Sequence, residues 1–290
     1  DDAYYYSAWY YIPENVTPQD WWNVWQWKHT YDGNSSNSKP TYVLDVRNNN
    51  GTYRLHLTYR PDLASKINYT QTTMEVPTGK WFHIEGYYKE SQTSSGQVII
   101  WQDGVKVFDV TGNPTLLSND KLLFFSVNNY TDNISPAPCT IYVDDVVIST
   151  SRTGVGSQSQ STAESTTEPT VVPTSEPTQA PTTVPTAEPT QVSTEQPAAE
   201  SGVVFSSDFE TGNLSEWLAD NNGDFIAQGD GTYKVNTVQA HSGKYAAALT
   251  IDTSKSSSTG SHASYLFFWK DLPDDAYYYS AWYYIPENVT

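Results

Sequence analysis

The sequence predicts an all-β fold, an antiparallel β-sandwich that carries an extended linker rich in Pro and Thr. Short runs of Tyr, Trp, Val and Ile alternate with Gly, Asn, Asp and Pro, as in sandwiches built from many short strands. No long stretch has the periodicity of an amphipathic helix, so we expect little helix. Residues 151–202 differ abruptly, because they contain no aromatic residue and consist largely of Thr, Ser, Pro, Glu and Gln. Such a segment cannot bury enough apolar surface to fold by itself.

About a dozen runs have the composition and alternation of strands. Taken in order, they cover residues 3–12, 23–29, 41–47, 52–60, 81–89, 97–104, 105–111, 121–128, 139–148, 233–238, 245–251 and 261–270. NNNG at residues 48–51 and the dipeptide Asp103-Gly104 predict hairpin turns, because Asn, Asp and Gly tolerate positive φ. Cys139, the one cysteine, begins one of the runs and is expected to be a small buried hydrophobic residue.

Residues 1–17 return letter for letter as residues 274–290, which gives a period of 273 residues, the separation of residues 1 and 274. Self-similarity at a fixed period is typical of repeat arrays. We therefore interpret the chain as one unit of a tandem array whose two ends lie inside one strand. On this interpretation, residues 1–150 are the C-terminal part of one domain, residues 151–202 are the linker, and residues 203–290 are the N-terminal part of the next domain. Residues 203–273 followed by residues 1–150 then make one continuous domain, which is long enough for a single core.

The linker is expected to be extended. Pro recurs in it every few residues, which favours a polyproline II conformation. Thr beside Pro is also the composition of O-glycosylated stalks.

The composition excludes two classes of partner. The formal net charge is −18, from 33 acidic and 15 basic residues, so the chain lacks the basic surface of a nucleic-acid-binding protein and the basic cluster of a membrane-surface anchor. No apolar run approaches the roughly 18 residues of a transmembrane helix. We expect an extracellular or cell-surface protein, in which self-repulsion keeps an acidic polymer soluble.

Six segments, taken in the order of the continuous domain, resemble one fold family. They are residues 205–217, 5–15, 22–29, 79–89, 96–109 and 142–148, with the letters FSSDFETGNLSEW, YYSAWYYIPEN, WNVWQWKH, GKWFHIEGYYK, GQVIIWQDGVKVFD and YVDDVVI. In this order they resemble the concanavalin A-like jelly rolls of polysaccharide lyases of the heparin lyase I and glucuronan lyase type. The resemblance covers most of the domain, and it implies a jelly roll with a concave groove that holds a glycan.

Polar side chains on four strand-like runs are candidates for that groove. Side chains alternate between the two faces of a strand, so residues two apart point the same way. The candidates are Gln26 and Lys28, then Asp45 and Arg47, then Arg54, His56 and Thr58, and finally His83, Glu85 and Tyr87. If the four strands are neighbours, these side chains line the groove, and Trp and Tyr residues are available to stack on sugar rings. The alternative is that they form the solvated face of a half-buried antiparallel sheet.

The resemblance also implies a lyase reaction, which needs a group that neutralises a uronate carboxylate and a base, commonly His or Tyr, that removes the C5 proton. The family's Gln-x-His pattern is matched here only as Gln26-Trp27-Lys28, without the histidine. Lys28 could pair with a carboxylate, and His56, His83 or Tyr87 could act as the base. No position-by-position match supports these roles, so we expect no catalytic residues and a chain that is not an enzyme.

Jelly rolls of this kind often fasten their first and last strands with a structural Ca²⁺, which takes oxygen ligands from carboxylates and backbone carbonyls. The resemblance therefore implies a calcium site formed by Asp208 and Glu210 near the start of the domain and by Asp144 or Asp145 near its end. The alternative is that these acids occupy turns and exposed strand positions.

Asn-x-Ser/Thr tripeptides mark potential N-glycosylation sites in a secreted chain. Within one period they begin at Asn15, Asn34, Asn50, Asn68, Asn129, Asn133 and Asn213, and Asn288 repeats the first. We expect these asparagines at the surface.

The leading hypothesis is that the chain is the structural repeat unit of an extracellular filament or cell-surface stalk, with an adhesive or glycan-binding role. Its partners are then adjacent repeats of the same polymer and polysaccharide, and not nucleic acid. The alternative is a secreted modular protein that binds or degrades polysaccharide. A third hypothesis is domain swapping, in which separate chains with complementary halves polymerise head to tail.

Overall fold

The structure is a computed structural model that describes residues 3–9, 16–30, 38–62, 64–116, 123–154, 202–218, 223–268 and 278–284. Nearly all of its regular elements are strands, and the helix α1, Ser215–Leu218, is one turn long. In the described part of the chain, no helix has the length and apolar content to cross a membrane. Most of the predicted linker lies outside the described residues, as do Asn15 and Asn34.

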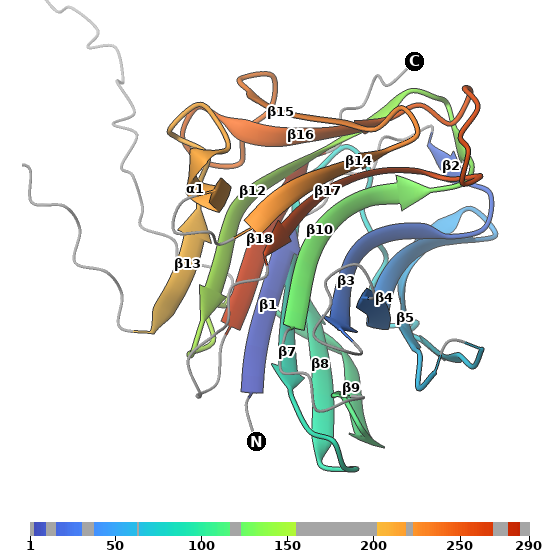
Figure 1. Cartoon of the computed structure of the whole chain (residues 1–290), viewed down its shortest axis with the longest axis vertical. Coiled ribbons are helices and arrows are strands. Elements are labelled where there is room, and N and C mark those ends of the chain that lie inside the picture. The colour runs from blue at the N-terminus through green and yellow to red at the C-terminus, as the bar shows by residue number, and fades with distance from the viewer. Residues whose placement is uncertain are drawn as a thin grey trace, which may run out of the picture. The chain divides into compact units, whose positions relative to one another are not determined.

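The larger sheet has nine strands and is antiparallel except for one pair. Its order is β15-β16-β12-β18-β1-β7-β8-β9, with β13 paired to β12, and β1 and β18 run parallel to each other (Figure 1). The strands are β1 Ala3–Trp9, β7 Phe82–Lys89, β8 Gly96–Gln102, β9 Val105–Asn113, β12 Cys139–Ser149, β13 Val203–Ser207, β15 Thr232–Asn236, β16 Ala246–Ile251 and β18 Tyr278–Tyr284. Strands that follow the linker in sequence therefore pair with β12, which precedes it.

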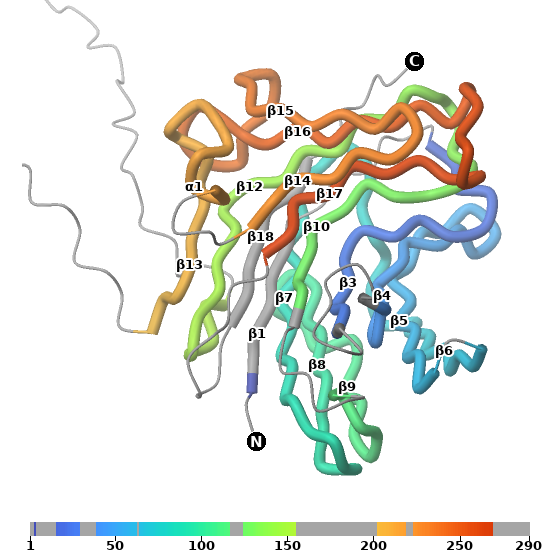
Figure 2. Tube along the Cα trace, viewed as in Figure 1, coloured from blue at the N-terminus to red at the C-terminus, as the bar shows by residue number. Residues whose placement is uncertain are grey.

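The second sheet has seven strands in the order β14-β17-β10-β3-β4-β5-β6, and β6 forms one edge (Figure 2). The strands are β3 Trp22–Thr30, β4 Ser38–Asn49, β5 Thr52–Tyr59, β6 Ile67–Thr70, β10 Leu123–Thr131, β14 Gly223–Gln228 and β17 His262–Phe268. Two short strands, β2 Thr17–Pro18 and β11 Ile134–Ser135, pair with each other. The sequence on both sides of the linker contributes to this sheet as well, because β17 pairs with β10.

The core lies between the two sheets and is rich in aromatic residues. β3 contributes Trp22, Trp25 and Trp27, which are all fully buried. Trp27 stacks on Tyr88 of the opposite sheet, with the ring centroids 5.0 Å apart. Because burial of large apolar side chains is the main favourable term in folding, these residues hold the two sheets together.

A buried amide also joins the two sheets. The side-chain nitrogen of Asn129, on β10, donates to the carbonyls of Cys139 at 3.0 Å and Leu249 at 2.9 Å, which belong to β12 and β16. Its side-chain oxygen accepts from the indole of Trp22 at 3.0 Å. Cys139 itself is fully buried, as predicted, and burial raises the pKa of its thiol.

The structure confirms the predicted antiparallel sandwich. Each of the predicted runs overlaps a strand, and both predicted hairpin turns have positive φ, at Asn50 (55°) and Gly51 (89°) and at Asp103 (47°) and Gly104 (78°). The strands β2, β6, β11, β13 and β14 were not predicted. They are short, and β6 and β14 are largely exposed, so they lack the alternation of apolar residues that marks a half-buried strand.

Candidate functional site

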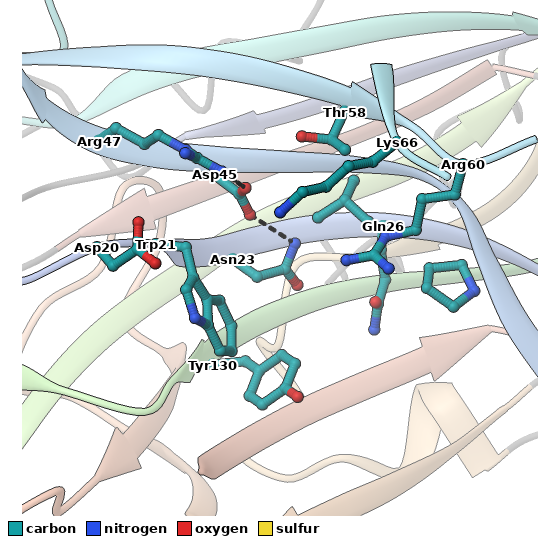
Figure 3. A pocket seen from close by; sticks show the side chains of 12 residues that line it. Asp20, Trp21, Asn23, Gln26, Asp45, Arg47, Thr58, Arg60, Lys66 and Tyr130 are labelled. Carbon is teal, nitrogen blue, oxygen red and sulfur yellow. Dashed lines mark hydrogen bonds and ion pairs between the residues drawn. The ribbon is translucent and has the colours of Figure 1, made fainter. Parts of the chain in front are cut away.

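A cavity of about 440 Å³ opens on the face of the seven-stranded sheet that points away from the core. Arg47, Lys66 and Arg60 reach in from one side, and Trp21 and Tyr130 stand opposite them (Figure 3). The full lining is Asp20, Trp21, Asn23, Gln26, Pro40, Val43, Asp45, Arg47, Thr58, Arg60, Lys66 and Tyr130. Ligand sites in proteins commonly have volumes of roughly 300–1,000 Å³, so the cavity has the size of a small-ligand site.

A β-bulge in β3 brings Asn23 and Gln26 to the same face. The pairing of β3 with β4 shifts by one residue between Asn23 and Trp25, so Val24 has no partner on β4. Residues three apart therefore share a face here, instead of residues two apart. The oxygen of Asn23 accepts from the amide of Asn128 at 2.5 Å, which holds Asn23 in place.

Several polar atoms at the cavity have no hydrogen-bond partner among the described residues. The side-chain nitrogen of Gln26 and Nε of Arg60 are both buried and both lack such a partner. The hydroxyl of Ser126, which lies opposite Gln26 on β10, is a third such atom. Leaving a buried polar group unsatisfied costs about 1–3 kcal/mol, so a ligand that hydrogen-bonds to these groups removes that cost.

Three cations and two acids line the cavity. Arg47 pairs with Asp45 at 3.2 Å, whereas neither Arg60 nor Lys66 has an ion pair with a carboxylate in the described part of the chain. Burial raises the pKa of Asp45, and the Arg47 guanidinium acts in the opposite direction. With Asp20 as the second acid, the formal charge of the lining is positive, although the chain as a whole carries −18.

An aromatic cluster, formed by Phe124, Tyr265 and Phe267, adjoins the cavity. The ring of Tyr130, which lines the cavity, lies with its centroid 5.4 Å from that of Tyr265. Trp21 packs edge-on against Tyr130, with the centroids 4.7 Å apart. Trp21 and Tyr130 are both partly exposed, so they offer ring faces and edges to a ligand in the cavity.

Lys28 lies over the aromatic cluster. Its amine is 5.1 Å from the ring centroid of Phe267 and 5.5 Å from that of Tyr265, and it has no carboxylate partner among the described residues. Burial lowers the pKa of Lys28 to about 8. Lys28 pairs across the sheet with Pro40, which lines the cavity, so this cation stands next to the site.

A family model described as polysaccharide lyase matches residues 1–147, which is half of the chain. The chain belongs to this polysaccharide lyase family. No curated protein matches the sequence. Among solved structures, the endo-β-1,4-glucuronan lyase of the fungus Trichoderma reesei is similar, with 20% identity and a TM-score of 0.33 over 41% of this chain and 52% of that one. The chain thus spans about half the length of that protein, and a likeness of this size carries no argument about activity.

In this member of the polysaccharide lyase family, four of the predicted groove residues line one cavity, namely Gln26, Asp45, Arg47 and Thr58. Lys28 is their neighbour, as described above. The structure therefore brings residues of three predicted strands together on β3, β4 and β5, which are adjacent in the sheet.

His56 and Arg54 lie on the same sheet but outside the cavity lining. His56 lies on β5, opposite Asp45 of β4, and is mostly buried. Its Nε2 is 3.2 Å from the side-chain nitrogen of Asn49. Burial and Arg47 lower the pKa of His56. Arg54 is held away from the cavity, because its guanidinium pairs with Glu75 at 3.3 Å.

The prediction that His83, Glu85 and Tyr87 join the groove is wrong. All three lie on β7, which belongs to the nine-stranded sheet and not to the sheet that forms the cavity. His83 and Glu85 are also buried, and burial lowers the pKa of His83 far below its usual range. Alternation showed that the three side chains share a face, but it could not show which sheet contains the strand.

Sequence reasoning missed much of the cavity lining. Asn23 was missed because the bulge breaks the alternation, whereas Arg60 continues the series of Arg54, His56 and Thr58 and could have been found. Lys66 and Trp21 lie in segments beside strands, and they carry no periodic signal. The other missed residues are Asp20, Pro40, Val43 and Tyr130.

The four predicted calcium ligands lie near one end of the β12–β13 pair, and three of them, Asp144, Asp145 and Glu210, contact one loop, residues 241–245. Asp144 and Asp145 accept hydrogen bonds from His241 and Ser242. The carboxylate of Glu210 accepts from the backbone N–H groups of Lys244 and Tyr245 in the same loop. Asp208 is exposed, and it directly follows Ser207, which pairs with Val146.

The donor chemistry of this region suits a hard cation, because its side chains offer carboxylate oxygens. Burial and the neighbouring Asp145 raise the pKa of Asp144 to about 9, so a second negative charge on this pair is costly without a cation. Among the described residues, however, no three Asp, Glu, His or Cys side chains converge on one point. The Asp144–Asp145 pair would therefore hold a cation together with backbone oxygens or water.

The prediction that Asn129 is glycosylated is wrong, because its side chain is fully buried and hydrogen-bonded between the sheets. A glycan cannot be attached there in the folded protein. The remaining described sequon residues, Asn50, Asn68, Asn133 and Asn213, are exposed, so their glycosylation stays a prediction.

Proposed function

We propose that the cavity binds an acidic polysaccharide through the carboxylates of its uronate residues. The observation that carries this proposal is the set of donors without partners among the described residues, above all Gln26 and Arg60, beside Lys66, which has no ion pair in that part of the chain. Guanidinium and ammonium groups form strong charge-assisted hydrogen bonds with carboxylates. Trp21 and Tyr130 supply the apolar contact that a sugar ring needs.

The family and the similar glucuronan lyase direct the choice of test ligand. Oligomers of β-1,4-linked glucuronate should bind, whereas β-1,4-linked glucose oligomers of equal length should bind far more weakly, because they differ only in lacking the carboxylate. Calorimetry with both oligomers at low and high salt measures this difference, and salt should weaken only the acidic ligand. Equal affinity for the two oligomers, or no binding of either, would contradict the proposal.

The second candidate function is cleavage of the same polymer, which the family match favours. In such an elimination, a base removes the C5 proton, the C4–O bond breaks, a C4–C5 double bond forms, and the departing oxygen takes a proton. In this candidate function, Arg60 would neutralise the carboxylate, Gln26 would donate a hydrogen bond to it, and the phenol of Tyr130, which also lines the cavity, would transfer the proton. Ultraviolet absorbance of the unsaturated product distinguishes cleavage from binding alone.

A prediction about Lys28 tests its part in the site. Replacement by methionine should weaken binding of the acidic oligomer, because a cation beside the cavity is lost. The variant should also remove the fall in affinity that the native chain shows as the pH rises through about 8, where Lys28 loses its charge. Lys106→Ala, which removes an exposed amine from β9, is the control and should leave the pH dependence unchanged.

The same Lys28→Met variant should be more stable than the native chain. The pKa of Lys28 is lower in the folded state than in the unfolded state, so its charge opposes folding below about pH 8. That penalty disappears as the pH rises from about 8 towards the unfolded value. Thermal melts at pH 6 and at pH 9.5 should therefore show the larger gain at pH 6, and a loss of stability at pH 6 would contradict this role.

We also propose that Ca²⁺ binds at the Asp144–Asp145 pair and stabilises the end of the β12–β13 pair. A chelator should then lower the melting temperature by about 5 °C, and an excess of Ca²⁺ should restore it, since a ligand of the folded state stabilises by mass action. Identical melts with chelator and with Ca²⁺ would rule the site out.

The duplicated segment supports a further proposal, that the chain is a unit of an extracellular repeat protein whose domains present the cavity many times. Mass measurement of the native polypeptide tests it. Masses that step by one 273-residue period would support the array, and a single short polypeptide would exclude it.

A further inference from the structure

The edge strand β6 brings one of the exposed sequon asparagines to the rim of the cavity. Asn68 lies opposite Thr58 of β5, and the hydroxyl of Thr58 donates to the side-chain oxygen of Asn68 at 3.0 Å. Thr58 lines the cavity, and so does Lys66, which precedes Asn68 by two residues (Figure 3). Residues directly opposite each other on paired strands share a face, so Asn68 points to the side of the sheet that holds the cavity.

The contact with Thr58 also places the atom that an N-linked glycan modifies. Asn68-Tyr69-Thr70 is a complete sequon. The glycan is attached to the side-chain nitrogen, which is bonded to the same carbon as the oxygen that Thr58 contacts. Asn68 is exposed, and β6 is the last strand of its sheet on this side. The described part of the chain therefore leaves room for a sugar whose first ring lies beside the cavity lining.

The other exposed sequon residues of the described chain lie elsewhere. Asn50 is in the turn between β4 and β5, and Asn133 precedes β11. Asn213 precedes α1, and its amide hydrogen-bonds with the backbone beside that helix. Of these four asparagines, Asn68 is the one whose side chain hydrogen-bonds to a residue that lines the cavity.

We propose that a glycan on Asn68 controls access to the cavity, so that the glycosylated chain binds acidic polysaccharide weakly and the unglycosylated chain binds it well. This inference rests on the proposed binding function of the cavity. A sugar chain anchored at the rim competes with the polymer for the same space. Because it is tethered, its effective concentration at the cavity is high, and a free polymer cannot displace it by dilution.

A comparison of glycosylated chains tests the proposal with a matched pair of variants. The full chain is produced in a eukaryotic secretory pathway, and mass spectrometry of its glycopeptides measures the occupancy of Asn68. Thr70→Ala removes this sequon and keeps the contact between Asn68 and Thr58, whereas Ser215→Ala removes the sequon of Asn213 beside α1. Thr70→Ala should bind the glucuronate oligomer about tenfold more tightly than the native glycoprotein, and Ser215→Ala should bind like the native glycoprotein.

A cysteine variant tests the blocking effect without a glycosylating host. The one native cysteine, Cys139, is fully buried, and burial raises the pKa of its thiol, so a thiol reagent leaves it intact. Asn68→Cys and Ser215→Cys are each coupled to the same neutral thiol-reactive oligosaccharide. The conjugate at position 68 should bind the glucuronate oligomer about tenfold more weakly than the conjugate at position 215. Asn68→Cys that carries a methylthio group should bind like the native unglycosylated chain.

The outcomes separate this inference from the proposed function. If the unglycosylated chain does not bind the oligomer, the proposed function is wrong and this inference falls with it. If that chain binds, equal affinities of the two oligosaccharide conjugates would overturn this inference alone. So would a secreted chain in which Asn68 carries no glycan, or equal affinities of Thr70→Ala and the native glycoprotein.

Discussion

Replacing Arg152 by alanine is expected to lower the free energy of unfolding by about 3 kcal/mol, because it leaves a buried carboxylate without its cation. The side chain of Glu85 is fully buried, and Nε of Arg152 donates to it at 2.7 Å. The backbone N–H of Gly154 donates to the other oxygen at 3.0 Å. The guanidinium also lies 4.2 Å from the ring centroid of Trp101. This ion pair therefore anchors the start of the linker on the nine-stranded sheet.

Arg54→Ala is the matched control for this prediction. It removes the same side chain from an ion pair whose acid, Glu75, is 67% exposed, and exposed pairs contribute about 0–1 kcal/mol. Denaturant unfolding of both variants measures the contrast. Adding Glu85→Gln to Arg152→Ala should recover part of the loss, because the buried charge is then gone. Equal effects of the two arginine variants would show that the Glu85 charge needs no partner.

Replacing Arg60 by alanine should weaken binding of a glucuronate oligomer about tenfold to a hundredfold. A hydrogen bond between charged groups contributes about 1.5–3 kcal/mol, and about 1.4 kcal/mol corresponds to a factor of ten in affinity. Arg60 is the guanidinium of the lining that has no carboxylate partner in the described chain, so its positive charge is available to a ligand. Stability should change little or rise, because the variant removes a buried donor that has no partner among the described residues.

Calorimetry of Arg60→Ala and of Lys106→Ala distinguishes binding at the cavity from attraction by the net charge of the molecule. Both variants lose one positive charge, but Lys106 lies on β9 of the other sheet. A specific site requires a large loss for Arg60→Ala and a small one for Lys106→Ala. Similar losses in both would mean that affinity follows only the overall charge of the molecule.

The strands and turns were predictable because their signals are local. Alternating apolar residues and Asn-Gly or Asp-Gly turns follow from the backbone preferences of neighbouring residues, and the structure has strands and positive φ values where these signals occur. Part of the cavity was predictable for the same reason, since Gln26, Asp45 and Arg47 follow the alternation of strands that do pair.

The remainder of the site depends on contacts between residues far apart in the sequence. The bulge at Val24 arises where β3 pairs with β4, and it turns Asn23 towards the cavity. Tyr130 reaches the cavity only because β10 lies beside β3. The same pairing also positions Asn129. Its sequon predicted an exposed side chain, but in the structure the side chain points into the core.

The sequence by itself determined that this chain is an all-β protein with two copies of one strand, because composition, alternation and duplication are written in neighbouring residues. Only the tertiary structure decided that β7 lies in the sheet without the cavity, that unsatisfied donors gather at Gln26 and Arg60, and that β1 and β18 both pair with β7. Sheet membership and register follow from long-range pairing and burial, which the local alternation of side chains does not encode.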